Sequence, residues 1–524
     1  MEPTNNHQSP SVKFLFTDIG PVNHAELELG DLTIVAGCNN TGKTYLVYTL
    51  YGFLKMWYSW PNARHFLIGN DDIAQNDDTN EADPDDEYPD REHYADEDEY
   101  VEDVGSGKEG KPLHDKWRNL PQRIGMLVRR AMKEGQATWT IDRENLDQER
   151  KKVIKSLAQS FSKTALYGVF SSSPDDFKRA SLNVELIGEF PKNHSLEEKF
   201  PSGDVFSIRY NGEKIVLTRD RTEKQHNSSF DDEALFLIPR LYLRFLFPEL
   251  FWAPFVLSAE RFGISLFYKE LDFTKNQLVD LLQKVGAEKN RKHFSPFFLI
   301  DKTTSRYALP IKDNIDYTRN LSDFQKQTSE LHEHKLFDEI KDMIRGYYKS
   351  SGDDIKFKST TRNKEHSFSI PLHLASSSAR GLSDLYFFLR HVAQKNHLLI
   401  IDEPESHLDT TNQILLARLL ARLVRTGLKV LITTHSDYLV KEINNLIMLS
   451  NSFEGKDKVV RKLGYKEDDF LEPDSIRGYV AEENRLTKCA VDKFGVEMPI
   501  FDTTIDKINR ASNELASRVR GTES

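Results

Sequence analysis

Short apolar runs alternate with helical patterns along this chain, most clearly near its two ends. Residues 12–29 predict two strands around a turn, and the run 32–36 predicts a short buried strand. A helix is expected from Lys43 to about residue 60, because apolar side chains recur there every three or four positions. Towards the other end, strands and helices alternate at 398–401, 413–425, 429–433 and 438–446. This alternation predicts an α/β fold with a parallel or mixed sheet flanked by helices.

The middle of the chain has a more mixed pattern. Residues 111–163 are predicted to be mainly helical and are basic, with 13 Lys or Arg against 6 Asp or Glu. Further strands are predicted at 184–190, 205–210, 214–218, 252–257, 355–358, 367–371, 478–481 and 487–491. Further helices are predicted at 232–247, over most of 276–348, and at 505–519.

We therefore predict one head domain interrupted by a large insertion. The head takes its N-terminal part from residues 1–60 and its C-terminal part from residues 251–524. Between them we predict an acidic insertion at 61–110 and a lid region of helices and β-hairpins at 111–250. No heptad pattern continues beyond about three turns, so a long coiled-coil arm is not expected.

Composition narrows the class of protein. The 524 residues contain no run of about 18 uncharged apolar side chains, so we expect no membrane-spanning helix. The two cysteines, Cys38 and Cys489, are too few for a disulfide framework or a four-cysteine zinc site. The first residues lack the basic and apolar parts of a secretory leader, so we expect a cytoplasmic protein.

The net charge of −11 is unevenly distributed. Residues 71–103 hold 17 Asp or Glu and only one basic residue, Arg91. Such a segment buries too little apolar surface to fold, and we predict a disordered loop. It is either a solvated insertion or an acidic arm that guards a basic surface. The basic residues within 129–155 are either a solvated helical face or a surface for phosphates or a partner.

A phosphate-binding loop is the strongest motif. Residues 37–44 fit the pattern G-x-x-x-x-G-K-[ST] as Gly37, Cys38, Asn39, Asn40, Thr41, Gly42, Lys43 and Thr44. The glycines allow backbone N–H groups to surround phosphates, and the following helix points its positive end at them. We expect Lys43 to reach the β- and γ-phosphates and the Thr44 hydroxyl to hold Mg²⁺.

Two later strands end in polar side chains that suit the same chemistry. The strand 398–401 is followed by Asp402, expected to bind the metal, and by Glu403, expected to polarise the attacking water. The strand 429–433 is followed by His435, about 30 residues after Asp402, where we expect it to contact the γ-phosphate.

The order of these motifs resembles the ABC-type ATPase heads of SMC, RecF and OLD proteins. The resemblance makes Asp402 and Glu403 the Walker B pair, 406–409 the D-loop and His435 the switch histidine. The segment 375–383 then corresponds to the signature sequence, with serines in place of the usual glycine pair. This implies that Ser376, Ser377 and Ser378 bind the γ-phosphate held by another subunit; a plain serine N-cap is the alternative.

The serine-rich signature, the loop 39–44 and the strand end at 258–261 also resemble OLD-type ATPases of bacterial anti-phage systems. Closest in kind are the PtuA ATPases of Septu and of retron systems that contain Septu; the PARIS ATPase is a near alternative. The resemblance implies ATP and Mg²⁺ as cofactors and a homodimer or higher oligomer with composite sites. It also implies a separate HNH nuclease of the PtuB kind, with a reverse transcriptase and its nucleic acid as further partners.

The sequence also bears on three other functions. About 90 residues follow His435, and they hold no D-x-D pair of the kind a Toprim nuclease needs, so we expect no nuclease in this chain. The alternative function is a RecF- or SMC-like repair ATPase that clamps duplex DNA. A scaffold with a degenerate nucleotide site is disfavoured, because Lys43, Asp402, Glu403 and His435 are all present.

Overall fold

The computed structural model describes residues 10–58, 130–131, 134–199, 205–220, 241, 243–248, 250–267, 307–351, 354–360 and 368–522. By their contacts, the residues group into two units, which are described separately. The first contains 1–58, 147–190 and 249–524, and the second contains 59–146 and 191–248. Residues 147–190, which the sequence assigned to the inserted region, thus belong by their contacts to the first unit.

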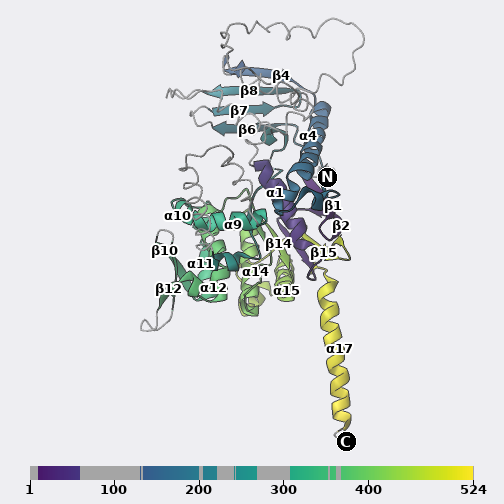
Figure 1. Cartoon of the computed structure of the whole chain (residues 1–524), viewed down its shortest axis with the longest axis vertical. Helices are drawn as coiled ribbons and strands as arrows, with labels where there is room; N and C mark the ends of the chain where they lie inside the picture. Colours follow the sequence, from purple (N-terminus) through teal and green to yellow (C-terminus); the bar gives the residue numbers. More distant parts are fainter. Residues whose placement is uncertain are drawn as a thin grey trace, which may run out of the picture. The chain divides into compact units, whose positions relative to one another are not determined.

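A nine-stranded sheet forms the centre of the first unit (Figure 1). Its strands, in spatial order, are β5 (Ser181–Ile187), β1 (Ser11–Ile19), β2 (Val22–Glu28), β16 (Arg485–Lys488), β15 (Ile476–Glu482), β3 (Leu32–Gly37), β14 (Lys429–Thr434), β13 (His397–Ile401) and β9 (Ala253–Leu257). The run from β15 to β9 is parallel, whereas β5, β1 and β2 pair antiparallel. The sheet is therefore mixed, which confirms the predicted fold class.

Burial explains why the central strands are continuous apolar runs. All six residues of β3 are buried, as are the last four of β13 and the last five of β14. A parallel strand is covered on both faces, so both sets of alternating side chains must be apolar. β1 instead alternates between buried and more exposed positions, as expected for a strand with one covered face.

Helices cover this sheet. The helix α1 (Lys43–Tyr58) packs on β9, β1, β3 and β14, and α14 (Thr410–Arg425) packs on β14 and beside α15 (Asp437–Met448). Among its described residues, the first unit also contains α4 (Arg143–Thr164, which begins just before it), α5 (Leu166–Val169), α9 (Leu309–Arg319), α10 (Leu321–Phe324), α11 (Leu336–Ile344), α12 (Ser377–Gly381), α13 (Ser383–Phe387), α16 (Lys456–Leu463) and α17 (Pro499–Thr522). Short turns of 3-10 or π-helix lie at Pro174–Phe177, His332–His334, Leu372–Leu374, Phe388–Val392 and Pro473–Ser475.

Two small sheets complete the first unit. One is antiparallel, with β10 (Gly346–Ser351), β11 (Asp354–Ser359) and β12 (Ser369–Pro371), and the other is the pair β17 (Val491–Asp492) and β18 (Gly495–Val496). The sequence predicted β11 and β12, but it placed β10 at the end of a helix. Tyr347 and Tyr348 suit a strand as well as a helix, and pairing with β11 decides the matter.

The second unit contains a four-stranded antiparallel sheet, in the order β4 (Gln136–Thr140), β8 (Lys214–Asp220), β7 (Val205–Tyr210) and β6 (His194–Lys199). β7 and β8 form the predicted hairpin, and Gly212 in its turn has a φ of +92°. The helical prediction for 111–163 is wrong at β4, which gains its ladder from β8.

Some predictions fall outside the described residues: the acidic segment 71–103, most of the predicted helix 232–247, and the stretch 276–306. Among the residues that the structure describes, no helix is both long and apolar enough to cross a bilayer.

Candidate nucleotide-binding site

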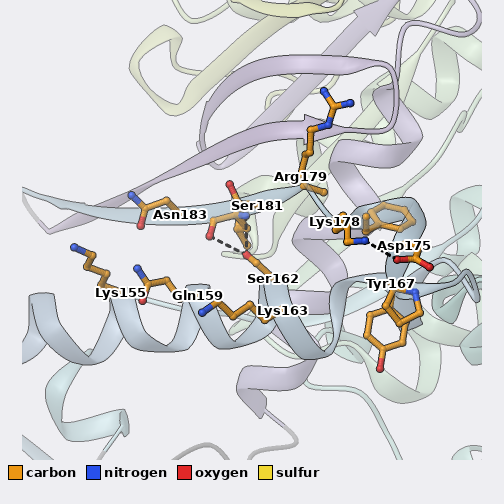
Figure 2. Close-up of a pocket in the computed structure, with 14 residues that line it drawn as sticks. Lys155, Gln159, Ser162, Lys163, Tyr167, Asp175, Lys178, Arg179, Ser181 and Asn183 are labelled. Carbon is orange, nitrogen blue, oxygen red and sulfur yellow. Dashed lines mark hydrogen bonds and ion pairs between the residues drawn. The ribbon is translucent and has the colours of Figure 1, made fainter. Parts of the chain in front are cut away.

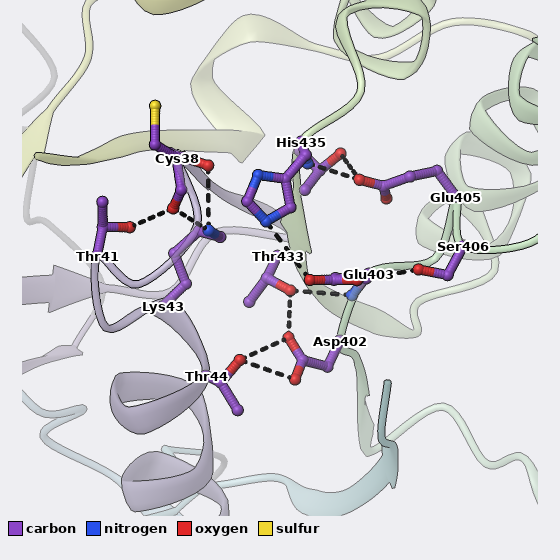
Figure 3. Close-up of polar contacts among 12 residues, drawn as sticks. Cys38, Thr41, Lys43, Thr44, Asp402, Glu403, Glu405, Ser406, Thr433 and His435 are labelled. Atoms are coloured by element: carbon purple, nitrogen blue, oxygen red, sulfur yellow. Dashed lines mark hydrogen bonds and ion pairs between the residues drawn. The ribbon is translucent and has the colours of Figure 1, made fainter. Parts of the chain in front are cut away.

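The predicted phosphate-binding loop joins β3 to α1 (Figure 3). Gly37 and Gly42 have φ values of +155° and +90°, the second well inside the region that favours glycine. A Cβ on Gly42 would lie 2.4 Å from Cγ2 of Val22, and one on Gly37 would lie 2.5 Å from the carbonyl oxygen of Ala481. Both glycines are therefore required by the turn itself and by its close neighbours.

The other loop residues are either exposed or hydrogen-bonded within the loop. Asn39 and Asn40 are exposed, and Asn40 has a φ of +63°. The Thr41 hydroxyl donates to the carbonyl oxygen of Cys38 at 2.9 Å. The Lys43 ammonium is buried and donates to the carbonyl oxygens of Gly37 at 3.0 Å and Cys38 at 2.8 Å. Burial lowers the pKa of Lys43, against the opposing effect of the Glu403 and Asp402 carboxylates.

Thr44 and Asp402 meet as predicted. The Thr44 hydroxyl donates to Oδ2 of Asp402 at 3.0 Å, and the buried Thr433 hydroxyl hydrogen-bonds to Oδ1. Burial raises the pKa of Asp402, while the hydrogen bonds from Thr433 and Thr44 work in the opposite direction. Parallel strands β13 and β14 bring Asp402 and Thr433 together across 31 positions of sequence.

These groups fit the magnesium ion that the sequence led us to expect. A hydroxyl and a carboxylate are the hard oxygen donors that Mg²⁺ takes, and the ion usually keeps waters and phosphate oxygens as its other ligands. In the described ranges, no group of three or more His, Cys, Asp or Glu side chains is placed to hold a metal by itself. A site completed by phosphates does not need such a group.

Glu403 lies at the turn that follows β13, with a φ of +48°. Its backbone N–H donates to the Thr433 hydroxyl at 2.9 Å, and its Oε2 accepts from Ser406 Oγ at 3.0 Å. Oε1 lies 3.4 Å from Nε2 of His435. The hydrogen bond with His435 is the main cause that lowers the pKa of Glu403 to about 2. The carboxylate is therefore ionised throughout the physiological range.

His435 is oriented by a residue that the sequence had not singled out. Oε1 of Glu405 accepts from the His435 backbone N–H at 2.6 Å and from the Thr434 hydroxyl at 2.9 Å. The predicted Glu403 and His435 are thus brought together, and Glu405 fixes the backbone that carries the imidazole. The only sequence signal for this role was the third acid in Asp402-Glu403-Pro404-Glu405.

The three predicted signature serines lie at the start of α12. Ser376 is the N-cap, and its Oγ accepts from Ala379 N at 3.3 Å. Ser378 Oγ donates to the carbonyl oxygen of His407 at 2.9 Å, and Ser377 is half-buried. No hydrogen bond among the described residues joins these serines to the loop 37–44 of the same chain. The role of the serines towards a second subunit stays a prediction.

Two further residues come from the strand end at 258–261. The Tyr48 hydroxyl donates to Oε2 of Glu260 at 3.2 Å, and the charge of Glu260 contributes to the raised pKa of Asp402. Arg261 is buried and donates to the carbonyl oxygens of Asp402 and Glu403, both at 2.8 Å. β9 pairs with β13, which brings Arg261 to the turn that follows β13. The sequence marked this strand end but gave neither residue a role.

One family of known proteins matches most of the chain, including the segments that form this site. The family described as AAA ATPase domain matches residues 20–440, which contain the loop, the Walker B pair and His435. The chain belongs to this family. It therefore contains an ATPase domain, and an ATPase domain uses a nucleotide.

Other comparisons are more distant. No functionally curated protein matches the chain. Among solved structures, it is similar to the Smc head domain of Pyrococcus furiosus bound to the C-terminal domain of ScpA, with 11% identity, 96% of this chain and 100% of that chain covered, and a TM-score of 0.31. It is also similar to the SMC head domain of Thermotoga maritima, with 10% identity, 92% of this chain and 99% of that chain covered, and a TM-score of 0.28. At such TM-scores, these likenesses add nothing to the family assignment.

Proposed function

We propose that this ATPase is the sensor and regulator subunit of an anti-phage defence complex of the Septu or retron type, and that it controls a separate HNH nuclease. The observation that carries the proposal is the Glu403 carboxylate, held between Ser406 and His435 beside the Lys43 loop. Because all the residues expected to hydrolyse ATP are present, a protein that cycles between ATP-bound and ATP-free states is favoured over a passive scaffold. The defence role is supported by the resemblance of the serine-rich signature and of the strand end 258–261.

The residues divide the work of hydrolysis among them. The loop N–H groups and Lys43 bind the phosphates. Thr44 and Asp402 would hold Mg²⁺, which would supply further positive charge to the phosphates. Glu403, with its pKa lowered to about 2, is a weak proton acceptor. It acts mainly as a fixed negative charge that aligns water for attack on the γ-phosphate. His435 contacts the same phosphate and holds Glu403 in place.

Two heads complete each site under this proposal. The serines of α12 in one head bind the γ-phosphate held by the loop of the other, so ATP closes a dimer and hydrolysis opens it. A two-fold dimer contains two such sites, so one substitution in the chain alters both of them. Opening and closing of this dimer then control the activity of the bound nuclease.

Affinity purification tests the partner. We expect a tagged chain, expressed in the cytoplasm of its native cells, to retain an HNH nuclease, with or without a reverse transcriptase and its nucleic acid. The Glu403→Gln variant, held in the ATP-bound form, should change the amount retained. The Lys43→Ala variant serves as the matched control that cannot respond to ATP. Purification without any nuclease from phage-challenged cells would contradict the proposal.

A second function, the duplex-DNA clamp of RecF- or SMC-like repair ATPases, is favoured by one feature of the first unit. A groove of about 600 Å³ lies between α4 and β5, lined by Lys155, Lys163, Lys178 and Arg179 among other residues. Figure 2 shows Lys155 and Gln159 rising from α4 towards Asn183 and Ser181. Lys178 pairs with Asp175 at 3.0 Å, whereas Lys155, Lys163 and Arg179 form no ion pair with a described residue.

The spacing on α4 suits a run of phosphates. Lys151, Lys155, Gln159 and Lys163 are four residues apart, which corresponds to steps of roughly 6 Å along one face of a helix. A clamp that uses this face should bind duplex DNA with a strong salt dependence, and the double variant Lys155→Glu with Lys163→Glu should reduce the salt slope by about 2. Lys326→Glu, at an exposed lysine paired with Asp323, is the control. An unchanged slope excludes this function for the groove.

A further inference from the structure

Arg261 is a buried cation next to the catalytic turn. It follows β9 and begins a helical segment, 261–267, and only 4% of its surface is exposed. Burying a guanidinium is costly unless its donors are satisfied and its charge is balanced. Its position is therefore expected to depend strongly on the groups around it.

The guanidinium of Arg261 joins three segments of the chain through backbone carbonyl oxygens. Nη1 donates to Ser258 at 3.0 Å and to Asp402 at 2.8 Å, and Nη2 donates to Glu403 at 2.8 Å. Nε donates to Gly381, the last residue of α12, at 3.3 Å. The planar fork of five N–H donors makes this possible, and the three donors of a lysine ammonium cannot reproduce it.

The next residue strengthens the same connection. The Phe262 ring stacks on His407, with centroids 4.2 Å apart, and the Arg380 guanidinium lies 4.2 Å from the Phe262 centroid. Ser378 bonds to the carbonyl oxygen of His407 at 2.9 Å. The short signature helix is thus tied at both its ends to the turn 403–407.

The charge of Arg261 is balanced from the signature side as well. Asp384, the second residue of α13, is buried, and its ionised form interacts with the charge of Arg261. Burial raises the pKa of Asp384 to about 7, against the opposing effect of Arg261, so near neutral pH this carboxyl group is only partly ionised. Asp402, Glu403 and Glu405 interact with it from the catalytic side. The Arg261 guanidinium therefore interacts with Asp384 next to the signature helix and with the carboxylates of the catalytic turn, Asp402, Glu403 and Glu405.

We propose that Arg261 is a positioning residue that transmits nucleotide occupancy from the Walker B turn to the signature helix of the same head. Glu403 has a left-handed backbone, so a shift of its carboxylate towards water and γ-phosphate is expected to move the peptide that Arg261 holds. The rigid fork passes that movement to Gly381 and α12. The role of this movement in ATP turnover rests on the proposed composite site, since α12 acts on ATP only if it serves a second head; the transmission within one head does not.

Hydrogen exchange of the backbone amides at 376–382 tests the transmission directly. The full chain is compared with and without Mg²⁺ and the non-hydrolysable analogue AMP-PNP, at a concentration where it is monomeric. We expect the analogue to change exchange at 376–382 in the parent chain, and the change to fall at least fivefold in Arg261→Met. Affinity for the analogue should stay within threefold, because the contacts of Lys43 are untouched.

Arg422→Met is the matched control. Arg422 is a partly buried arginine of the first unit, with 10% of its side chain exposed, and it is bonded to Asp469 at 2.6 Å and to Glu339. No hydrogen bond or ion pair among the described residues joins it to Glu403 or His435. This variant should lose stability but keep the change in exchange. Arg261→Lys keeps a positive charge near Asp384 but lacks the planar set of N–H donors. It replaces Arg261→Met in the test if that variant does not fold.

The outcomes separate this inference from the proposed function. A folded Arg261→Met or Arg261→Lys chain with the full change in exchange overturns the role of Arg261, as does a parent chain with no change at 376–382. ATP-driven association, measured by ultracentrifugation at higher protein concentration, tests the composite site. If the exchange result holds and association is absent, the composite site is wrong and the transmission stands. If both hold, Arg261→Met should also lose ATP-driven association, and a variant that keeps it overturns the role of Arg261.

Discussion

Replacing Glu403 with glutamine should slow ATP hydrolysis strongly and leave ATP binding intact. The amide keeps the shape of the side chain and an oxygen that can accept from Ser406, but it removes the charge that faces His435. In the proposed site, the loop 37–44 and Lys43 bind the phosphates, and this change does not touch them. The loss should therefore appear in kcat, with the Kd for ATP within about threefold of the parent value.

The expected fall in kcat follows from the lowered pKa of Glu403 together with the usual cost of losing a general base. A pKa lowered from 4.5 to about 2 corresponds to at most about 3 kcal/mol of interaction with the carboxylate. Because 35% of the side chain is exposed, solvent screening reduces this to about 1–2 kcal/mol. Loss of general-base assistance costs about 10²–10⁴ in rate. Glu403 is a weak proton acceptor, so we expect the lower part of that range, about 10²–10³ in kcat.

Single-turnover hydrolysis of radiolabelled ATP measures this effect free of product release. The control is Glu405→Gln, the same chemical change two residues away, on a carboxylate that faces the His435 backbone; it should cost less than about tenfold. A rate for Glu403→Gln within threefold of the parent would refute the assignment of Glu403.

The pH dependence gives an independent check on the same residue. The folded pKa of Glu403 is lower than its ordinary value, so its ionised form stabilises the fold above about pH 4.5, and this contribution is lost as the pH falls towards 2. Glu403 should therefore produce no acid limb in the ATPase profile between pH 5 and pH 8. A limb in that window that disappears in Glu403→Gln would show that the carboxylate titrates where the structure says it does not.

Three further predictions concern the loop and the signature. Lys43→Ala should weaken ATP binding at least 100-fold in a fluorescence titration, because the loop loses its cation, and unchanged affinity would contradict the loop assignment. Gly42→Ala should destabilise the chain by about 1–3 kcal/mol in thermal unfolding and weaken ATP binding, since it forces a Cβ to 2.4 Å from Val22; an unchanged Tm and Kd would exclude this. Ser377→Arg should leave ATP binding within threefold but stop turnover, and mixing it with Lys43→Ala should restore at most one working site per mixed dimer. A turnover rate independent of protein concentration would instead point to sites within one chain.

The sequence was most informative where local pattern and burial agree. β3, β13 and β14 are continuous apolar runs because both faces of a central parallel strand are covered, and each run ends in the residues that form the site. The loop 37–44 was predictable for the same local reason: its glycines, Lys43 and Thr44 act within one strand–loop–helix unit. Asp402, Glu403 and His435 were predictable because each directly follows such a strand.

Only the tertiary structure decided which distant segments meet. Pairing of β9 with β13 brings Arg261 to the carbonyls of Asp402 and Glu403, 141 and 142 positions away, and no local pattern encodes that contact. β4 and β10 are strands because β8 and β11 provide their hydrogen-bonding partners, although the segments around them are helical in pattern. The sequence by itself thus determined the chemistry at the end of each strand, since neighbouring residues supply it. The side-by-side order of the strands comes from long-range pairing, and that order makes the separate ends one site.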